Sequence, residues 1–316
     1  MLSPGDRDLA DNRSPLLLVA SLLLGSLLLS APLGCQSQQN GEPSSQPVAE
    51  VLATDSSLAV RDRVPAGWVT LRMENEGSRH HSFRLRKLPK DKTYADFRQA
   101  VLRPADSLEK ALAQGRIDST TYRRELRGAL PEWFPGKTNI VGGITGLAPG
   151  RTAQITHDLG PGHYALLCFF QTPGRRPHVF RGVRAGLEVT EDSSGAPAPT
   201  ADLTAHLSPQ AFEVDTSALS DEQTIAFRST GGPEGKPSPF VGLFRLSDET
   251  DADAVVSWIE SRLPLPAPTD WIGGPEPMPA GDVAYVRVGD LQPGRYAWIT
   301  QVATDTSGMV KTFSVK

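Results

Sequence analysis

The chain has 316 residues, with 32 Lys and Arg against 36 Asp and Glu, which gives a formal net charge of −4. This length exceeds what one small core needs and fits two domains, and no aromatic-rich basic motif supports nucleic-acid binding. The 27 Pro and 29 Gly, with many short apolar runs between turn signals, are typical of a mainly β protein with helical insertions.

Residues 1–35 are interpreted as a signal peptide for export. Leu16–Leu29 is an apolar run, shorter than the roughly 20 residues that a membrane-spanning helix needs. Leu33-Gly34-Cys35 resembles a bacterial lipobox, in which the Cys is lipidated and becomes the mature N-terminus, although Pro32 and the acidic n-region depart from that pattern. We therefore predict a protein of the cell envelope, anchored through a lipid on Cys35 on the periplasmic or extracellular side. An ordinary signal peptide with a chance Cys, or a retained N-terminal anchor, are the alternatives.

The polar residues 36–47 predict a flexible tether. The chain has 2 Cys, so acylation of Cys35 leaves Cys168 without a partner for a disulfide. An unpaired thiol in an oxidising compartment needs a reason to persist. Cys168 is therefore either a small buried apolar residue or a soft metal ligand.

From residue 48 onward the chain repeats itself weakly but in order. Both copies contain a Gly-Gly pair, a Leu-x-Pro-Gly-x-Tyr-Ala motif and a closing strand that begins with Gly. These matches are Val141–Gly143 with Ile272–Gly274, Leu159–Ala165 with Leu291–Ala297, and Gly182–Val189 with Gly308–Val315. We predict a first domain at 48–192, a linker at 193–203 and a second domain at 204–316.

Short runs with alternating side chains predict strands that bury one face. His81, Phe83 and Leu85 share one parity, and so do Tyr164 and Cys168. Pro-Gly dipeptides mark turns between consecutive strands. Strands of this length and spacing fit a β-sandwich or a barrel.

Each copy also carries a helical insert between an early strand and the Gly-Gly pair. In the first copy the insert covers about residues 91–132, with a helix that starts at Thr93-x-x-Asp96 and further helices at Ser107–Gln114 and Thr120–Leu130. In the second copy one helix is predicted near Asp251–Arg262. We expect these inserts to cover an end or a face of each sandwich.

Charge is unevenly distributed between the two copies. Residues 79–137 hold 14 Lys and Arg against 7 Asp and Glu, whereas residues 206–316 hold 8 against 15. This distribution indicates two solvated surfaces of opposite sign that dock against or steer each other.

The first copy resembles the cupredoxin family over about Val48–Asp192, apart from the helical insert. The resemblance is carried by Val64–Leu71 with Asn75-Glu-Gly77 after it, by a His just before a strand, and by the Leu-x-Pro-Gly-x-Tyr strand that ends in Cys. It implies a mainly β fold of two Greek-key cupredoxin-like β-sandwiches, each with a helical insertion.

The same resemblance implies a type 1 copper site in the first copy. The implied ligands are His81, Cys168 and His178, with Val183 in the place of the weak axial Met. Two imidazoles and a thiolate suit both Cu(I) and Cu(II), so that electron transfer needs little rearrangement. Because Val183 cannot coordinate, a bound copper is expected to be three-coordinate and of raised potential.

The other histidines are given no metal. His81 is preferred to His80 because it shares the inward parity of the strand, and His80 is expected to point to solvent. His157 and His163 are interpreted as turn or surface residues, and His206 receives no role.

Two features depart from the family pattern. Nine residues separate Cys168 from His178, more than in most blue-copper loops, so this loop must fold back for His178 to reach a metal. The second copy has Pro239 and Thr300 where the first has His81 and Cys168, although it keeps Gly308-Met309. The second copy is therefore predicted to be a structural or binding module.

The predicted function is that of an exported, lipid-anchored cupredoxin-like protein, which binds one copper for electron transfer or copper handling and has a redox protein as partner. The alternative is a metal-free structural or interaction lipoprotein, in which Cys168 packs as a small hydrophobe and the histidines are hydrogen-bonded. An enzyme is not favoured, because Leu167 and Phe169 flank Cys168 in place of further His ligands and no Gly-x-Ser-x-Gly elbow is present.

Overall fold

The computed structural model describes residues 45–61, 63–134, 139–171, 176–232, 235–261, 266–300 and 309–316. The predicted signal peptide, Cys35 and most of the predicted tether lie outside these residues. Within them, strands predominate, and all belong to one compact unit. No helix in this part of the chain has the length and apolar character needed to cross a membrane.

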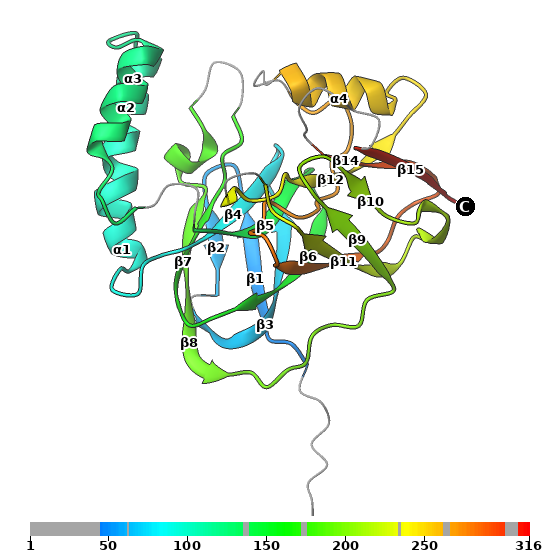
Figure 1. Cartoon of the computed structure of the whole chain (residues 1–316). Helices are drawn as coiled ribbons and strands as arrows, with labels where there is room; N and C mark the ends of the chain where they lie inside the picture. The colour runs from blue at the N-terminus through cyan, green and yellow to red at the C-terminus, as the bar shows by residue number, and fades with distance from the viewer. Residues whose placement is uncertain are drawn as a thin grey trace, which may run out of the picture. The chain divides into compact units, whose positions relative to one another are not determined.

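The first copy folds as a β-sandwich (Figure 1). Its strands are β1 (Val48–Ala53), β2 (Leu58–Val60), β3 (Arg63–Asn75), β4 (His81–Lys87), β5 (Ile140–Leu147), β6 (Thr152–Leu159), β7 (Gly162–Leu167) and β8 (Arg184–Ser193). In one sheet β1 lies between β2 and β3, parallel to β3, and β3 pairs with β6. In the other sheet the order is β8, β7, β4, β5. The long β3 joins both, because its first residues pair with β8 before a register shift after Pro65.

The second copy repeats most of this pairing. Its strands are β9 (Leu203–Leu207), β10 (Phe212–Glu213), β11 (Gln223–Ser229), β12 (Val241–Leu246), β13 (Val283–Val288), β14 (Gly294–Thr300) and β15 (Val310–Val315). β9 pairs with β10 and, in parallel, with β11, β11 pairs with β13, and β12, β14 and β15 form a second sheet. The internal repeat in the sequence is therefore a repeat of strand order. The exact domain boundaries stay a prediction.

The Gly-Gly pair occurs in both copies for the same steric reason. All four glycines have positive φ values, between 104° and 130°. A Cβ on Gly143 would lie 2.1 Å from the carbonyl oxygen of Phe83, and a Cβ on Gly274 would lie 2.1 Å from that of Val241. A larger residue would thus be strained and would also collide with the neighbouring strand.

The Leu-x-Pro-Gly-x-Tyr motif also has one structural role in both copies. The Tyr164 hydroxyl donates to the carbonyl oxygen of Gly160 at 2.7 Å, and the Tyr296 hydroxyl donates to that of Gln292 at 2.6 Å. Both rings are buried, so each hydroxyl needs this internal partner. The tyrosine reaches back across the Pro-Gly turn and fixes the start of its strand, as in the tyrosine corner of other sandwiches.

The two copies join edge to edge. β6 pairs antiparallel with β13, so one sheet runs on from the first copy into the second. The two Gly-Gly segments also meet, through bridges from Ile144 to Pro275 and from Leu147 to Ile272. A single hydrophobic core cluster contains residues of both copies. This continuous sheet was not predicted from the sequence.

Two ion pairs between the copies support the junction, and the first of them also joins the two oppositely charged segments. Arg84 Nε lies 2.7 Å from Glu276 Oε2, and Arg151 Nη2 lies 2.8 Å from Asp270 Oδ2. Glu276 is buried, and a buried carboxylate needs such a partner. Part of the uneven charge distribution is therefore explained by an ion pair that forms where the two copies meet.

The helices stand at the sides of the sheets (Figure 1). They are α1 (Tyr94–Phe97), the π-helical segment η1 (Arg98–Leu102), α2 (Arg103–Ala113), α3 (Ser119–Ala129) and α4 (Ala252–Ser261), with 3-10 turns η2 (His178–Arg181) and η3 (Thr216–Ala218). The predicted capping box is present, since Thr93 and Asp96 bond reciprocally at the start of α1. The predicted second helix at Ser107–Gln114 was wrong in its start. Helical structure continues unbroken from Tyr94 to Ala113, with the π-helical segment η1 directly before Pro104 at the start of α2.

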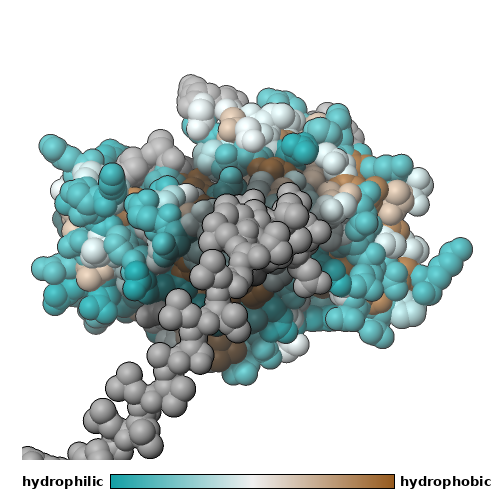
Figure 2. Space-filling view, turned by 90° about the horizontal axis from the view of Figure 1, so that it is seen from below, coloured by the Kyte–Doolittle hydropathy of each residue, from teal (hydrophilic) through white to brown (hydrophobic). Residues whose placement is uncertain are grey.

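Both helical inserts cover a sheet, as expected. Phe97 and Val101 pack on Leu167 of β7, and Val255 of α4 belongs to a cluster with Phe244 and Trp271. Figure 2 shows one face of the molecule, on which hydrophilic residues form the periphery and hydrophobic ones appear nearer the middle.

Candidate metal centre

Two of the predicted ligands lie at one end of the β8–β7–β4–β5 sheet. His81 is the first residue of β4, and Cys168 directly follows β7. Because β4 and β7 are antiparallel neighbours, the start of one and the end of the other are adjacent. The inward parity predicted for His81 is confirmed, since it is as fully buried as Phe83 and Leu85.

The loop after Cys168 brings the third residue back. The His178 N–H donates to the carbonyl oxygen of Phe170 at 2.8 Å, and the Val179 N–H donates to that of Cys168 at 2.7 Å. Residues 172–175 lie outside the described residues, but the two ends of the loop are hydrogen-bonded to each other. The loop thus folds back as required, and His178, at the start of η2, lies beside Cys168.

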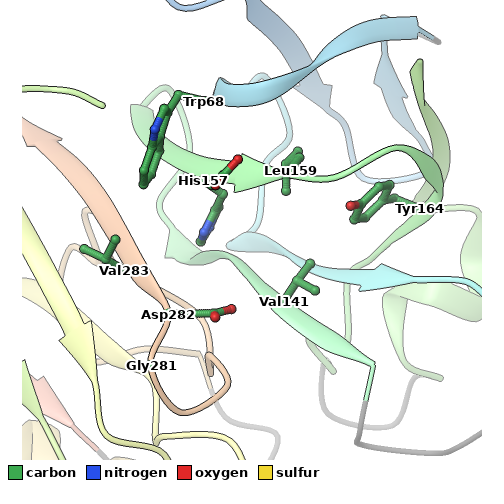
Figure 3. A pocket seen from close by; sticks show the side chains of 9 residues that line it. Trp68, Val141, His157, Leu159, Tyr164, Gly281, Asp282 and Val283 are labelled. Atoms are coloured by element: carbon green, nitrogen blue, oxygen red, sulfur yellow. The ribbon is translucent and has the colours of Figure 1, made fainter. Parts of the chain in front are cut away.

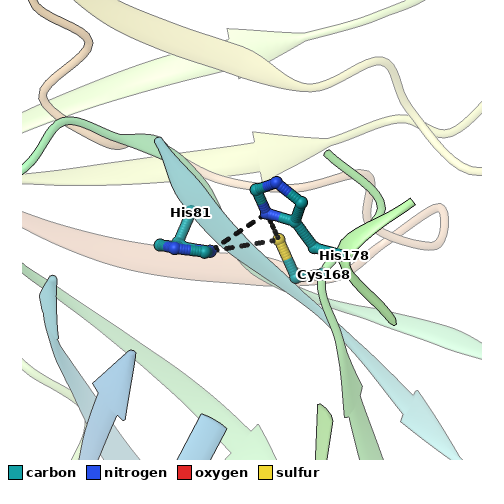
Figure 4. A group of neighbouring side chains, drawn as sticks. All are labelled: His81, Cys168 and His178. Carbon is teal, nitrogen blue, oxygen red and sulfur yellow. Dashed lines mark hydrogen bonds between the residues drawn. The ribbon is translucent and has the colours of Figure 1, made fainter. Parts of the chain in front are cut away.

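The three side chains converge on one point (Figure 4). His81 Nδ1 lies 3.2 Å from His178 Nδ1, and Cys168 Sγ lies 3.8 Å and 3.7 Å from these nitrogens. A point equidistant from the corners of a triangle with these sides lies about 2.1 Å from each atom. Bonds from a first-row metal such as zinc measure about 2.0–2.1 Å to imidazole nitrogen and about 2.3 Å to thiolate sulfur. One ion therefore fits between the three atoms with very small adjustments.

Burial governs the charge state of the thiol. Cys168 is fully buried, and desolvation raises the pKa of its thiol to about 11. Backbone N–H groups of Ser82 and Phe170 oppose this shift by hydrogen bonding to the sulfur, the first at 3.5 Å. Without a metal the thiol keeps its proton at neutral pH, whereas a bound cation would replace that proton.

The two imidazoles are neutral ligands. Burial lowers the pKa of His178 to about 4, and it also lowers the pKa of His81 although Asp55 partly offsets it. Neutral imidazoles direct unshared electron pairs at neighbouring atoms, and such pairs repel unless a proton or a cation lies between them. Within the described part of the chain, His81, Cys168 and His178 form the only group of three or more His, Cys, Asp or Glu side chains close enough to share one ion.

Val183, which the resemblance puts in the place of the axial Met, is a fully buried apolar residue. Its carbonyl oxygen accepts from the Cys168 N–H at 3.2 Å, and its own N–H donates to the carbonyl oxygen of His178 at 3.1 Å. These bonds place Val183 next to two of the three converging residues.

The prediction for His80 was wrong. Its ring is half-buried and stacks on Phe170 with ring centroids 6.4 Å apart, and burial lowers its pKa. Its Nε2 is buried without a hydrogen-bond partner among the described residues. The alternation along the strand predicted that His80 points away from the core of the first copy. The second copy, which includes Asp270, lies on that side and buries the ring.

The prediction for His157 as a turn or surface residue was also wrong. His157 is only 3% exposed, lies within β6, and burial lowers its pKa to about 4. Its Nε2 accepts from the Gly143 N–H at 3.3 Å. The sequence contained a pattern that predicts this burial, because His157 has the same period-two parity as the buried residues Ile155 and Leu159.

His157 also lines a pocket of about 230 Å³ (Figure 3). Trp68, Asp158 and Tyr164 of the first copy and Asp282 of the second share this lining. Burial, and then the charge of Asp158, raise the pKa of Asp282. None of the three converging residues lines it, so this pocket is separate from the candidate metal centre.

The chain matches no protein-family model and has no significant match among curated proteins. Among solved structures it is similar to auracyanin from Roseiflexus castenholzii, with 22% identity and a TM-score of 0.27 over 46% of this chain and 98% of that one. It is similar to auracyanin A, a blue copper protein from Chloroflexus aurantiacus, with 17% identity and a TM-score of 0.25 over 46% and 99%. It is also similar to copper nitrite reductase from Nitrosomonas europaea, with 13% identity and a TM-score of 0.23 over 86% and 94%.

At such identities and TM-scores these likenesses say nothing about function. The strand order itself shows the architecture, since both copies form a sandwich with the same order of strands, apart from β5 and the pairing of β3 with β8, which have no counterpart among the described strands of the second copy. The fold is cupredoxin-like. The buried group of His81, Cys168 and His178 fits a type 1-like copper site.

Proposed function

We propose that the chain binds one copper ion through His81 Nδ1, Cys168 Sγ and His178 Nδ1, and that it transfers electrons. The observation that carries this proposal is the common point about 2.1 Å from all three atoms. Three soft or borderline donors in one plane suit copper in both oxidation states, whereas hard cations prefer oxygen ligands.

The surrounding protein supports rapid electron transfer. A bound copper would supply one-electron chemistry, by alternating between its two common oxidation states. The chain holds the donors rigidly, because His81 begins a central strand, Cys168 ends its neighbour, and His178 is hydrogen-bonded to that strand end. Fully buried side chains exclude water and cannot easily rearrange, so little reorganisation accompanies a change of charge.

Val183 favours the reduced form in this proposal. A weak axial ligand stabilises the oxidised ion, and an aliphatic side chain supplies none. We therefore expect a higher reduction potential than in blue-copper sites that have an axial Met.

Electron transfer is proposed in preference to catalysis. Copper oxidases and nitrite reductases need ligands for further metal ions, and the described residues contain one metal-ligand cluster. Copper handling without electron transfer fits the same ligands, but it would favour an exposed site, and His81, Cys168 and His178 are all buried.

Location and partners extend the proposal. The apolar segment Leu16–Leu29 and the lipobox-like Leu33-Gly34-Cys35 support export and a lipid anchor on Cys35. A protein tethered in this way through residues 36–47 would meet its redox partner near the membrane surface.

The purified protein loaded with Cu(II) should bind one copper per chain and show an intense visible band from thiolate-to-copper charge transfer. Cys168→Ser should abolish the band, because the alcohol cannot replace the thiolate. Thr300→Ser, at the matching position of the second copy, should leave it unchanged. A colourless protein without stoichiometric copper would refute the proposal and favour a metal-free interaction role.

A further inference from the structure

We propose that Asp55 is a positioning residue of this site, which holds the His81 imidazole with Nδ1 facing the metal position. This inference deepens the proposed function and rests on it. Asp55 lies in the turn between β1 and β2, 26 residues away in sequence from His81. None of the family-type motifs in the sequence includes it.

The contact assigns a role to each ring nitrogen. Asp55 Oδ1 lies 3.2 Å from His81 Nε2, whereas Nδ1 of the same ring faces Cys168 and His178. An ionised carboxylate only accepts hydrogen bonds, so Nε2 carries the proton. Nδ1 is then the nitrogen with the free electron pair, which is what a metal needs.

The carboxylate is itself held in place. Ser78 donates to it from its backbone N–H at 3.0 Å and from its hydroxyl, and Arg79 Nη1 lies 3.2 Å away. Ser78 and Arg79 thus contact both carboxylate oxygens and hold Oδ1 towards the His81 ring.

Two glycines make room for this arrangement. A Cβ on Gly77 would lie 2.7 Å from Asp55 Oδ1 and 2.8 Å from His81 Nε2, too close to both atoms of this contact. A Cβ on Gly182, which has φ of 108°, would lie 2.3 Å from the carbonyl oxygen of Ser56 in the same turn. The backbone on both sides is thus shaped to let the turn approach the site.

The charge has a predictable effect on a bound copper. A carboxylate hydrogen-bonded to a ligating imidazole raises the basicity of the ring and favours the more highly charged ion. Asp55 should therefore lower the reduction potential, opposite to the effect of Val183. The two residues together would set the potential of the site.

Two variants of Asp55 separate its effect on the orientation of the His81 imidazole from the effect of its negative charge. The first measurement uses the metal-free protein. Asp55→Asn keeps an oxygen that can accept from Nε2–H, whereas Asp55→Ala removes it. Nitrogen NMR of the metal-free protein should show the Nε2–H tautomer of His81 in the wild type and in Asp55→Asn, and a mixture of tautomers in Asp55→Ala. An unchanged tautomer in Asp55→Ala would overturn the proposal.

The copper-loaded protein provides the second readout. Asp55→Asn should retain copper but raise its reduction potential, and Asp55→Ala should lower copper affinity by about 10–100-fold. Glu188→Gln is the matched control, because it removes a carboxylate that pairs with Arg63 at the surface and whose cross-strand neighbour is His163, not one of the three proposed ligands. Equal potentials in wild type and Asp55→Asn would contradict the assigned role of the charge.

The outcomes also distinguish this inference from the proposed function. If the wild type takes up no copper but Asp55→Ala mixes the tautomers of His81, the copper proposal fails and the positioning contact stands. If copper binds with the expected colour but Asp55→Ala changes neither tautomer nor affinity, the positioning role fails alone. Asp55→Asn, which is nearly isosteric, keeps the test decisive if Asp55→Ala does not fold.

Discussion

The two copies place different side chains on the same backbone at corresponding ends of their sandwiches. The Cys168 N–H donates to the carbonyl oxygen of Val183 at 3.2 Å, and the Thr300 N–H donates to that of Met309 at 3.1 Å. Each of these bonds joins the strand that follows a tyrosine corner to the start of the closing strand. This backbone hydrogen bond is thus common to both copies, whereas the side chains beside it differ.

In the second copy this end of the sandwich needs no metal. The Thr300 hydroxyl donates to the carbonyl oxygen of Phe240, so its polar group is satisfied within the protein. Met309 is buried as part of the hydrophobic core. The second copy thus forms its two sheets without a set of metal-ligating side chains at this end.

The largest effect should follow from removing a ligand in the first copy. His178→Ala should lower copper affinity by at least on the order of 100-fold, since even residues that only support a ligand cost up to that much. Met309→Ala, in the second copy, should leave copper affinity unchanged. Titration of both variants with copper in the presence of a competing chelator measures the affinity. An equal loss of copper affinity in the two variants would contradict the assignment of the copper site to the first copy.

The pH dependence of copper binding should be the next largest effect. Because the Cys168 thiol has a pKa of about 11 and the His178 imidazole one of about 4, binding near neutral pH displaces one proton, from the thiol. Copper affinity should therefore rise about tenfold for each pH unit between roughly 7 and 9. Chelator competition at a series of pH values tests this, and a flat profile would mean that the thiol is not a ligand.

A smaller effect is expected where the two copies join. His157 on β6 has a folded-state pKa of about 4 against an ordinary value of 6.5, so the unfolded state takes up the proton first as pH falls. Stability is therefore complete above pH 6.5 and falls as pH drops towards 4, by up to about 3 kcal/mol.

Urea unfolding between pH 7 and 4 measures this dependence. His157→Gln should be less stable at neutral pH, because it loses a buried contact, but its stability should fall less steeply in this interval. His206→Gln, an exposed position on β9, should behave as the wild type does. An identical pH dependence in all three proteins would show that His157 does not determine acid sensitivity at the junction.

The sequence was sufficient for features that depend on local patterns. Alternation along β4 identified His81 as inward-facing, and the capping box identified the start of α1. The same period-two pattern indicated that His157 is buried, but this was missed because its neighbour Asp158 suggested a turn or surface position. Register errors of this kind come from weighing local turn residues above period-two alternation.

Other features depended on segments that are distant in sequence. His80 was expected at the surface because the first copy alone leaves it outside, and the second copy covers it. The pairing of β6 with β13 could not be read from either strand, since any strand edge offers the same unpaired backbone groups.

The sequence by itself determined the repeated motifs, the strand periodicity and the identity of the metal-ligand candidates, because these follow from residue type and short spacings. Only the tertiary structure decided that His81, Cys168 and His178 share one point, and that Asp55 approaches His81 from another turn. The reason is physical: ligand geometry depends on how strands and turns far apart in the chain pack together, and no local pattern specifies those distances.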